Sequence, residues 1–338
     1  MDNESWVEKF RPNNLSSIIS QEEIILSLKN ALVNKNIPHL LFFGPSGCGK
    51  TSTILALAKE LFGKELWEDR IIELNASDER GIKTVREKIK TYAKSSIKYH
   101  KDSPPWKIII LDEADNMTSD SQFALRKIME DYSSVTRFCI LCNYHHKIIN
   151  PIVSRCSLFR FRPISKDKIK EKLLSICKIE NIYCSTKNIN KIIDICSGDL
   201  RKAVNLLQKC KNNKNYFLNK DLKNRDDINS DIIYEISGIA PKKYIKTLLN
   251  KCIEGNEVEV NKYINFLFNQ SYSLTNQLNI ILDIIINIKS LNDFQKSEVV
   301  KIITEVDQRL IKGCDELIQY YRLAYFIMKI CKKNEINL

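Results

Sequence analysis

Residues 44–51 read GPSGCGKT, which fits the pattern G-x-x-x-x-G-K-[ST] of a phosphate-binding loop. The five residues before it, 39–43, form a short apolar run typical of a buried strand. Residues 50–61 after it have the spacing of an amphipathic helix. Backbone N–H groups at such a helix start bind phosphate oxygens, the lysine bridges phosphates and the threonine hydroxyl binds Mg²⁺. The sequence therefore predicts a site for ATP and Mg²⁺.

Short apolar runs alternate with helical patterns through the first half of the chain. This alternation is typical of βαβ units in a parallel sheet with helices on both faces. The expected strands cover residues 39–43, 71–75, 107–111, 137–142 and about 157–161, and the expected helices cover 50–61, 80–95 and 119–131. The first half is thus expected to be an α/β P-loop domain with a parallel sheet.

The strand pattern stops after Pro163, which marks an expected domain boundary. Residues 164–211 read as three short helices, and residues 212–231 have the polar composition of a linker, with room for one short helix. Long helical patterns then continue to the end of the chain. The overall fold class is therefore α/β plus all-α, with domains expected at residues 1–163, 164–231 and 232–338.

The composition favours a protein that binds polyanions and that does not span a membrane. The net charge is +12, which favours nucleic acid, although lysine, asparagine and isoleucine are frequent throughout the chain and weaken that inference. The apolar runs are far shorter than the ~20 residues of a membrane span, and the start of the chain lacks a signal-peptide pattern. The eleven cysteines are scattered, so free buried thiols are expected, and Cys139 and Cys142 are interpreted as strand packing.

Two carboxylates follow the expected strand at 107–111. Asp112 and Glu113 would lie at the carboxyl edge of the sheet, where open α/β sheets bind ligands. Asp112 is predicted to bind Mg²⁺ together with Thr51. Glu113 is predicted to polarise the water that attacks the γ-phosphate. Lys50 is expected to face solvent as a phosphate ligand.

Three further polar residues are weaker candidates. Asn143 ends the next strand at the same edge and is placed to orient water or contact phosphate. Arg155 precedes the last expected strand, and Arg201 lies in the helical region. On the residues alone, either arginine is more often a surface ion pair than a phosphate ligand.

Six motifs in order resemble the small subunits of replication factor C, the AAA+ clamp loader. They are WVEKFRP (residues 6–12), LNASDERGI (74–82), IIILDEAD (108–115), RFCILCNY (137–144), SRC (154–156) and GDLRKA (198–203). Towards the end, ISGIAP (236–241) and EVDQRLIKGCDE (305–316) resemble the collar by which eukaryotic small subunits assemble. The three expected domains would then be an AAA+ domain, a helical lid with its polar linker, and a helical collar for oligomerisation.

The resemblance implies a role for each matching residue. Asp112, Glu113, Asn143 as sensor 1 and Arg201 as sensor 2 would act on the subunit's own ATP, and Arg155 would be an arginine finger acting on a neighbour's ATP. ATP would be bound by Val7, Arg11, Pro12, Gly44, Pro45, Ser46, Gly47, Cys48, Gly49, Lys50, Thr51, Ser52, Asn143 and Arg201.

The implied partners are the large and other small replication factor C subunits, a sliding clamp of the PCNA type and primer–template DNA, with the nucleus as the location and no membrane. Arg80 and Arg86 would point from a helix start towards duplex phosphates, with Lys83 and Lys147 as weaker candidates. Contacts of this kind recognise shape and charge rather than base sequence, and they weaken with salt. Each of these residues is otherwise part of a solvated helix face.

The phosphate-binding loop departs from the family at Ser46 and Cys48, where proline and threonine are usual, and Phe10 replaces a usual tyrosine. None of these changes removes a phosphate-binding group. Because Cys48 would lie beside the phosphates, we predict that a thiol reagent blocks the binding of ATP. Two other functions stay open: a mainly structural subunit that donates Arg155 to a neighbour, and a different AAA+ DNA ATPase of the origin-binding or Holliday-junction kind. An archaeal homologue is also conceivable.

Overall fold

The computed structural model describes residues 4–34, 36–63, 66–76, 82–95, 103–217, 228, 230–288 and 291–332, without the side chains of 82–86, 213–217 and 332. The chain divides into two compact units, Met1–Gln208 and Lys209–Leu338, which are described separately. Within the described ranges, no helix is both long enough and apolar enough to cross a membrane.

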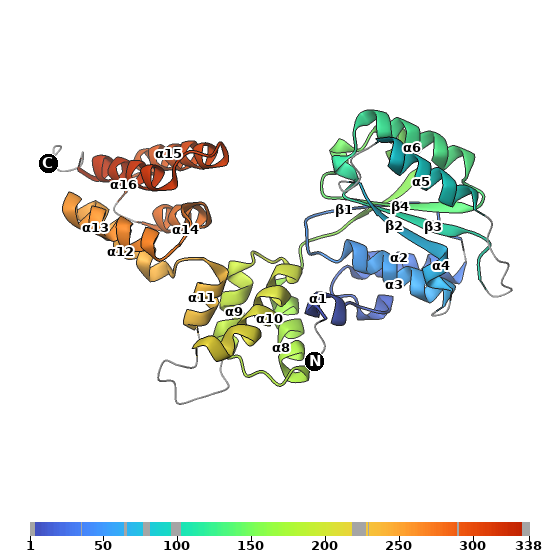
Figure 1. Ribbon diagram of the computed structural model, residues 1–338, viewed down its shortest axis with the longest axis horizontal. Coiled ribbons are helices and arrows are strands. Elements are labelled where there is room, and N and C mark those ends of the chain that lie inside the picture. Colours follow the sequence, from blue (N-terminus) through green and yellow to red (C-terminus); the bar gives the residue numbers. More distant parts are fainter. Residues whose placement is uncertain are drawn as a thin grey trace. The chain divides into compact units, whose positions relative to one another are not determined.

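The first unit is built on a five-stranded sheet (Figure 1). Its neighbouring strands all pair in parallel, in the order β2-β3-β4-β1-β5. The strands are β1 (His39–Phe43), β2 (Ile71–Asn75), β3 (Lys107–Asp112), β4 (Thr136–Cys142) and β5 (Cys156–Arg160). The expected parallel sheet is confirmed, with each strand end within one residue of the expected position.

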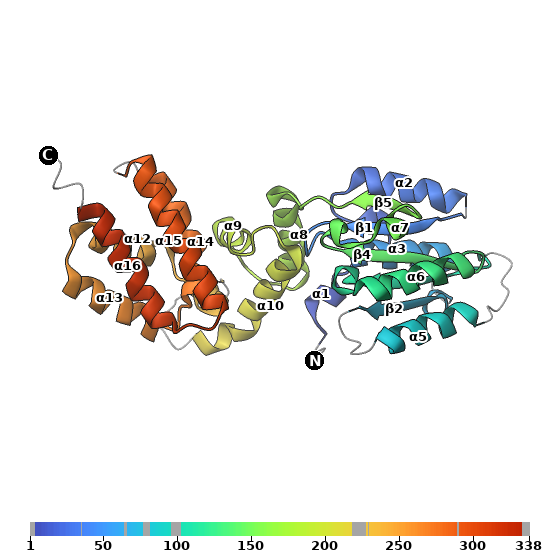
Figure 2. The ribbon, with the colours of Figure 1, turned by 90° about the horizontal axis from the view of Figure 1, so that it is seen from above.

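Side chains that alternate along the strands form a separate apolar core on each face of the sheet. On one face, Leu40 and Phe42 pack with Ile54, and on the other, Leu41 packs with Leu125. In Figure 1, α5 (Ile82–Lys94) and α6 (Ser119–Asp131) cover one face, and α2 (Glu22–Val33), α3 (Lys50–Phe62) and α4 (Trp67–Arg70) cover the other. Figure 2 looks down on the sheet from above, from the side that α5 and α6 cover.

Three helices follow the sheet and lie near the start of the chain. They are α8 (Lys166–Ile179), α9 (Thr186–Ile195) and α10 (Leu200–Phe217), and α1 (Trp6–Lys9) lies beside them (Figure 1). The backbone N–H of Trp6 donates to Oε1 of Gln208 at 3.1 Å, and Lys9 pairs with Glu180 at 2.7 Å. These contacts join the N-terminal segment to the helices that follow the sheet.

Helix α10 continues six residues beyond the position expected from the sequence. Residues 212–217 were expected in the polar linker, but they extend the helix to Phe217. Asparagine is only a moderately poor helix former, the one lysine is a good one, and the segment holds no glycine or proline to end the helix. That part of the linker prediction is wrong.

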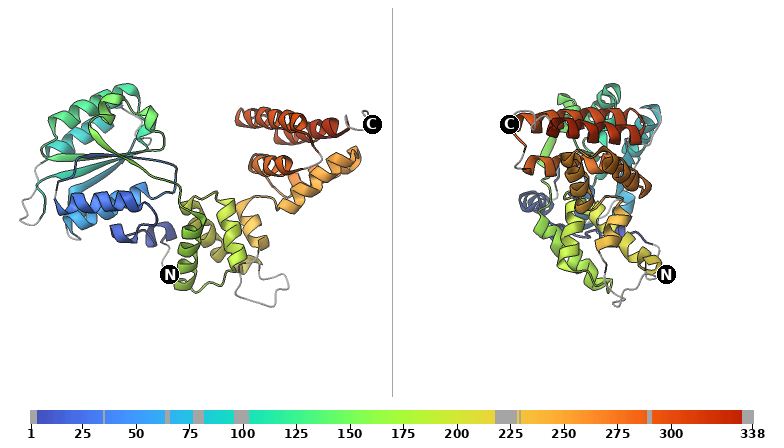
Figure 3. Two further views of the ribbon diagram at one scale, coloured as in Figure 1. Left: turned by 180° about the vertical axis from the view of Figure 1, so that it is seen from behind. Right: turned by 90° about the vertical axis from the view of Figure 1, so that its left-hand side faces the viewer.

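The second unit is all helical among its described residues, as expected. Its elements are α11 (Ser230–Ser237), α12 (Lys242–Glu254), α13 (Glu257–Asn269), α14 (Leu274–Asn287), α15 (Asp293–Ile311) and α16 (Glu316–Lys332). Helices α15 and α16, red in Figure 3, lie side by side and pack on the orange helices α12 to α14. The buried Tyr320 hydroxyl donates to Oε1 of Gln277, which satisfies both polar groups inside this core.

Several connections of the first unit contain a short helical segment, namely η1 (Leu15–Ser17), η2 (Ala114–Asn116), η3 (His145–Lys147) and α7 (Asn150–Val153). Eight of the eleven cysteines are buried, in keeping with the expected free buried thiols. Cys139 and Cys142 both lie on β4 in the apolar core, which confirms their interpretation as strand packing.

Candidate nucleotide-binding site

An open cleft of about 180 Å³ lies at the carboxyl edge of the sheet in the first unit. Its walls come from α1 and the residues after it, from the phosphate-binding loop, from the ends of β3 and β4, and from α8 and α10. The predicted residues that line it are Val7, Arg11, Pro12, Ser46, Gly47, Cys48, Gly49, Lys50, Thr51, Ser52, Asp112, Glu113, Asn143 and Arg201. Thus fourteen positions from five parts of the sequence meet at one cleft.

The loop between β1 and α3 curls in a way that only glycine tolerates at two positions. Gly44 has a φ of +150°, and a Cβ there would lie 2.3 Å from the carbonyl oxygen of Phe161. Gly47 has a φ of +68°, and its Cβ would lie 2.0 Å from Oδ1 of Asp199. Residues other than glycine would be strained or would clash at both places. Gly44 and Pro45, which begin this loop, are not among the residues that line the cleft.

Lys50 opens α3, but its side chain is buried, with 9% exposure. Its Nζ donates to the carbonyl oxygens of Gly44 at 2.7 Å and Pro45 at 2.8 Å, and to Oδ1 of Asn143 at 3.0 Å. The expectation that Lys50 faces solvent is therefore wrong. The ammonium group satisfies its three donors within the protein, since a buried charge without partners is costly.

Thr51 and Asp112 bring two oxygen ligands together across the cleft. The Thr51 hydroxyl donates to Oδ2 of Asp112 at 3.0 Å. Hydroxyl and carboxylate oxygens are the ligands that hard cations prefer. The pair therefore fits a divalent cation beside the lysine that would bind phosphate.

Glu113 lies in a strained backbone conformation directly after β3. Its φ is +52°, which is uncommon for residues other than glycine and concentrates at functional sites. Its backbone N–H donates to Oδ1 of Asp112 at 2.8 Å, and its Oε2 accepts from Nδ2 of Asn116 at 3.3 Å. The side chain is exposed, at the mouth of the cleft. This geometry leaves the carboxylate accessible to water next to the cation ligands.

Helix α10 contributes Arg201 to the cleft wall and an acidic contact to the phosphate-binding loop. The carboxylate of Asp199 caps α10 by accepting from the N–H of Lys202 at 3.1 Å, and it also accepts from the Ser46 hydroxyl at 2.8 Å. Asp199 lies inside the GDLRKA motif (residues 198–203), but the sequence alone predicted a role only for Arg201. Because serine replaces proline at position 46, this chain gains a hydrogen bond that proline cannot donate.

Other cleft residues were missed by sequence reasoning. Lys172, from α8, lines the cleft, and burial lowers its pKa. It is one lysine among many in the sequence, and no motif distinguishes it. Trp6, Phe10, Cys142, Leu200 and Val204 complete the lining. Cys48 also lines the cleft, but its side chain is only 2% exposed and burial raises its pKa, which opposes the thiol reactivity expected for it.

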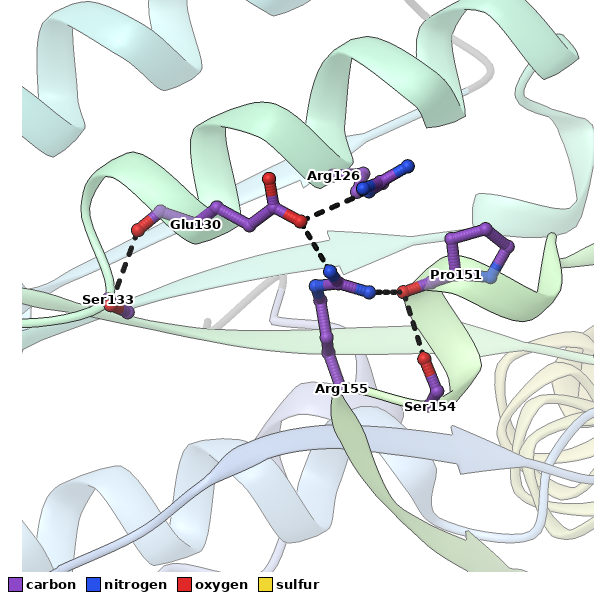
Figure 4. Close-up of polar contacts among 6 residues, drawn as sticks. All are labelled: Arg126, Glu130, Ser133, Pro151, Ser154 and Arg155. Carbon is purple, nitrogen blue, oxygen red and sulfur yellow. Dashed lines mark hydrogen bonds and ion pairs between the residues drawn. The ribbon is translucent and has the colours of Figure 1, made fainter.

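Arg155 lies at the opposite edge of the sheet from the cleft. It directly precedes β5, whose first residue, Cys156, pairs with His39, whereas the phosphate-binding loop begins after Phe43. Five strand residues at about 3.3 Å each separate the two edges by about 16 Å, which is longer than an arginine side chain. Figure 4 shows Arg155 held instead by Glu130 and by the carbonyl of Pro151.

The four candidate DNA ligands are only partly described. Arg80 lies outside the described residues, and Lys83 and Arg86 lie on α5 with side chains outside the description. Lys147 is exposed on η3, and its Nζ lies 5.2 Å from the ring centroid of Tyr144. The DNA contacts therefore stay a prediction.

The parallel sheet, the glycine-dependent loop and the lysine, threonine and acidic residues of the cleft define a P-loop ATPase. Residues 40–164 match the ATPase family associated with various cellular activities (AAA), and residues 240–325 match the replication factor C C-terminal domain. The protein is thus an AAA ATPase whose C-terminal helices match the replication factor C C-terminal domain.

The chain belongs to the replication factor C small subunits, the AAA ATPase components of the clamp loader. It is 40% identical to replication factor C subunit 2 of Saccharomyces cerevisiae over 332 residues, covering 96% of this chain and 93% of the relative. It is 41% identical to subunit 4 of Homo sapiens over 333 residues, covering 97% and 89%.

The sequence motifs point within this family to the subunit numbered four in human and two in yeast nomenclature, and these two relatives carry those names. The replication factor C small subunit of Archaeoglobus fulgidus is 40% identical over 332 residues, covering 98% of this chain and 99% of the relative. Identity alone therefore separates eukaryotic from archaeal relatives poorly. Among solved structures, the RuvB Holliday junction branch migration motor of Thermotoga maritima has a similar fold (17% identity, TM-score 0.52, covering 71% of this chain and 79% of that one).

Proposed function

We propose that this subunit binds ATP with Mg²⁺ and, as part of a hetero-oligomeric clamp loader, helps to open a sliding clamp of the PCNA type and load it at primer–template junctions during DNA replication and repair. ATP binding would drive opening and the grip on DNA, and hydrolysis would release both. The observation that carries this proposal is the meeting of Lys50, the Thr51–Asp112 pair and Arg201 at one cleft.

Each cleft residue has a role that its position supports. Lys50 would bind the β- and γ-phosphates, and Thr51 and Asp112 would hold Mg²⁺, which neutralises phosphate charge when bound. Glu113 would polarise the attacking water, which its exposed carboxylate favours. Asn143 would orient that water. The adenine and ribose would lie against Val7, Arg11 and Pro12, and Arg201 would contact the subunit's own ATP from α10.

Arg155 would act as an arginine finger on the ATP of a neighbouring subunit. The separation of about 16 Å between the two edges of the sheet supports this role, because Arg155 does not reach its own cleft. Such a finger stabilises the charge that develops on the phosphates and contributes roughly 10³-fold or more to the rate. The catalytic unit would then be an interface between two chains.

The remaining parts of the proposal concern assembly and DNA. We assign residues 1–163 to the nucleotide-binding domain, 164–231 to a lid with its linker, and 232–338 to a collar that joins the large and other small subunits. Arg80, Lys83, Arg86 and Lys147 would contact DNA phosphates, with the net charge of +12 favouring such binding. The site of action would be the nucleus, as for eukaryotic replication.

The experiment that tests this proposal places variants of the subunit in the assembled complex. Glu113→Gln keeps the shape of the side chain but removes the charge, so ATP should still bind while turnover at this cleft is lost. Arg155→Ala should leave ATP binding by this chain intact and slow hydrolysis at the adjacent site. If Glu113→Gln left clamp loading and ATP turnover unchanged, the catalytic role would be refuted and a mainly structural subunit would be the better description.

A further inference from the structure

The guanidinium group of Arg155 is ordered by its own chain (Figure 4). Its Nη2 donates to Oε1 of Glu130, and its Nη1 donates to the carbonyl oxygen of Pro151 at 2.6 Å. The side chain is 34% exposed. An arginine has five N–H donors, so these two contacts leave three donors for another acceptor. Arg155 is thus held in place and still has the capacity to bind phosphate.

The carboxylate that holds Arg155 is shared with a second arginine. Oε1 of Glu130 also accepts from Nε of Arg126, one helical turn earlier on α6, at 3.1 Å. The hydrogen bond and charge of Arg126, together with Arg155, lower the pKa of Glu130, so the carboxylate is ionised at neutral pH. Two guanidinium groups and one carboxylate leave a net charge of about +1. The cluster therefore orders Arg155 without cancelling its attraction for an anion.

The elements that carry this cluster are supported by the sheet. Glu130 lies in the last turn of α6, whose Leu125 and Met129 are buried against the strands, and Pro151 lies on α7, just before β5. Both elements end at the edge of the sheet where β5 begins. A long side chain anchored at two points of a rigid frame loses less freedom when it binds than an unanchored one.

We propose that Glu130 is a positioning residue for the arginine finger: its carboxylate fixes the guanidinium of Arg155 in the orientation that reaches the neighbouring subunit's phosphates. This inference rests on the proposed function, in which Arg155 acts in trans. In this role Glu130 would not contact ATP itself. It acts through the hydrogen bond to Arg155, with the carbonyl of Pro151 as the second anchor.

A merely structural ion pair would behave differently. Glu130 and Arg155 are 40% and 34% exposed, and pairs this exposed contribute little to stability. Substitution of Glu130 should therefore leave folding and assembly unchanged. Any loss of ATP turnover then reports the placement of Arg155 rather than the stability of the subunit.

The test uses the complete complex with Glu130→Gln, Arg155→Ala or both in this subunit, and single-turnover ATP hydrolysis measured by rapid quench. Glu130→Gln keeps a neutral acceptor but loses the charge-assisted bond. One ATP per complex should then be hydrolysed about tenfold more slowly, as expected for loss of one bond of this kind. The amount of bound ATP should stay the same. The double variant should be no slower than Arg155→Ala alone, because Glu130 acts only through Arg155.

Asp131→Asn is the matched control, since Asp131 is the next residue, is exposed and makes no ion pair with Arg155 in the described part of the chain. It should hydrolyse ATP like the wild type. If Arg155→Ala slows the adjacent site but Glu130→Gln does not, or if Glu130→Gln speeds hydrolysis, the positioning role is overturned while the proposed function stands. If Arg155→Ala itself has no effect on any site, the trans role fails and this inference fails with it.

Discussion

Replacement of Lys50 by methionine tests how the loop contacts and the nucleotide compete for one ammonium group. The substitution keeps the apolar stem of the buried side chain and removes only its charged end. In the structure, Nζ of Lys50 donates to the carbonyl oxygens of Gly44 and Pro45 and to Oδ1 of Asn143. The variant should therefore lose both the internal contacts of the loop and the contact with phosphate.

The loss of stability without nucleotide should be modest. Hydrogen bonds to a charged group contribute about 1.5–3 kcal/mol each when buried, but Pro45 and Asn143 are exposed and water can replace the ammonium there. We expect a total loss of about 1–3 kcal/mol in the unfolding free energy of the first unit. For a unit of 208 residues this corresponds to a decrease of roughly 3–9 °C in Tm.

The loss of stabilisation by ATP should be larger. At an ATP concentration of about 100 times Kd, the wild-type unit gains about 2.7 kcal/mol, or roughly 8 °C. If Lys50→Met weakens binding about 100-fold, as for loss of a charge-assisted contact, the gain at the same concentration falls to about 0.4 kcal/mol, or roughly 1 °C. The ATP-dependent shift should thus nearly vanish.

Tryptophan fluorescence is a suitable signal, because all three tryptophans, Trp6, Trp67 and Trp106, lie in the first unit. Thermal unfolding is followed with and without ATP and Mg²⁺ for the wild type, Lys50→Met and Lys127→Met. Lys127 is an exposed lysine on α6 and controls for the same chemical change. A Lys50→Met subunit that keeps the full ATP-dependent shift would refute the phosphate-binding role.

Two further predictions concern the reactivity of the thiols of Cys48 and Cys314 and the pH dependence of stability that His39 contributes. Alkylation at neutral pH should modify the exposed Cys314 at least about tenfold faster than Cys48, whose pKa is raised by burial, and peptide mapping that finds equal rates would contradict this. Burial, and then the charge of Arg137, lowers the pKa of His39 to about 4. Between about pH 6.5 and 4 the unfolded chain therefore binds more protons than the folded chain, and the free energy of unfolding falls as the pH is lowered through that range. His39→Gln should reduce that fall by about 1–2 kcal/mol, after allowance for partial exposure, in denaturant titrations at pH 7 and pH 4; an unchanged difference would rule out His39 as its source.

Most of the sheet could be predicted from the sequence because its signals are local. Short apolar runs set β1 to β5, and the loop motif between His39 and Phe62 fixed which strand carries the nucleotide site. The positions of Asp112 and Asn143 followed from chemistry, since the carboxyl ends of parallel strands meet at one edge. The helix α2 was missed although Ile24 and Leu28 are spaced for one helical face and are buried.

The contacts that decide how the site is held could not be predicted in the same way. The bond between Lys50 and Asn143 joins residues 93 positions apart, and the bond between Ser46 and Asp199 joins residues 153 positions apart. Such pairs depend on how helices and strands pack, and no local pattern encodes them. The same holds for Glu130, whose acidic side chain reads in sequence as one more charge on a solvated helix face.

The opposite placement of the phosphate-binding loop and Arg155 on the sheet has a genetic consequence. In the proposed arrangement, a substitution at Lys50 impairs only the site of the chain that carries it, whereas a substitution at Arg155 impairs a site built largely by another gene product. Complexes that incorporate the Arg155 variant should therefore keep ATP binding by this chain and lose hydrolysis at a site whose ATP another chain binds. Suppressors of that variant should map to the neighbouring subunit, at residues around its own ATP.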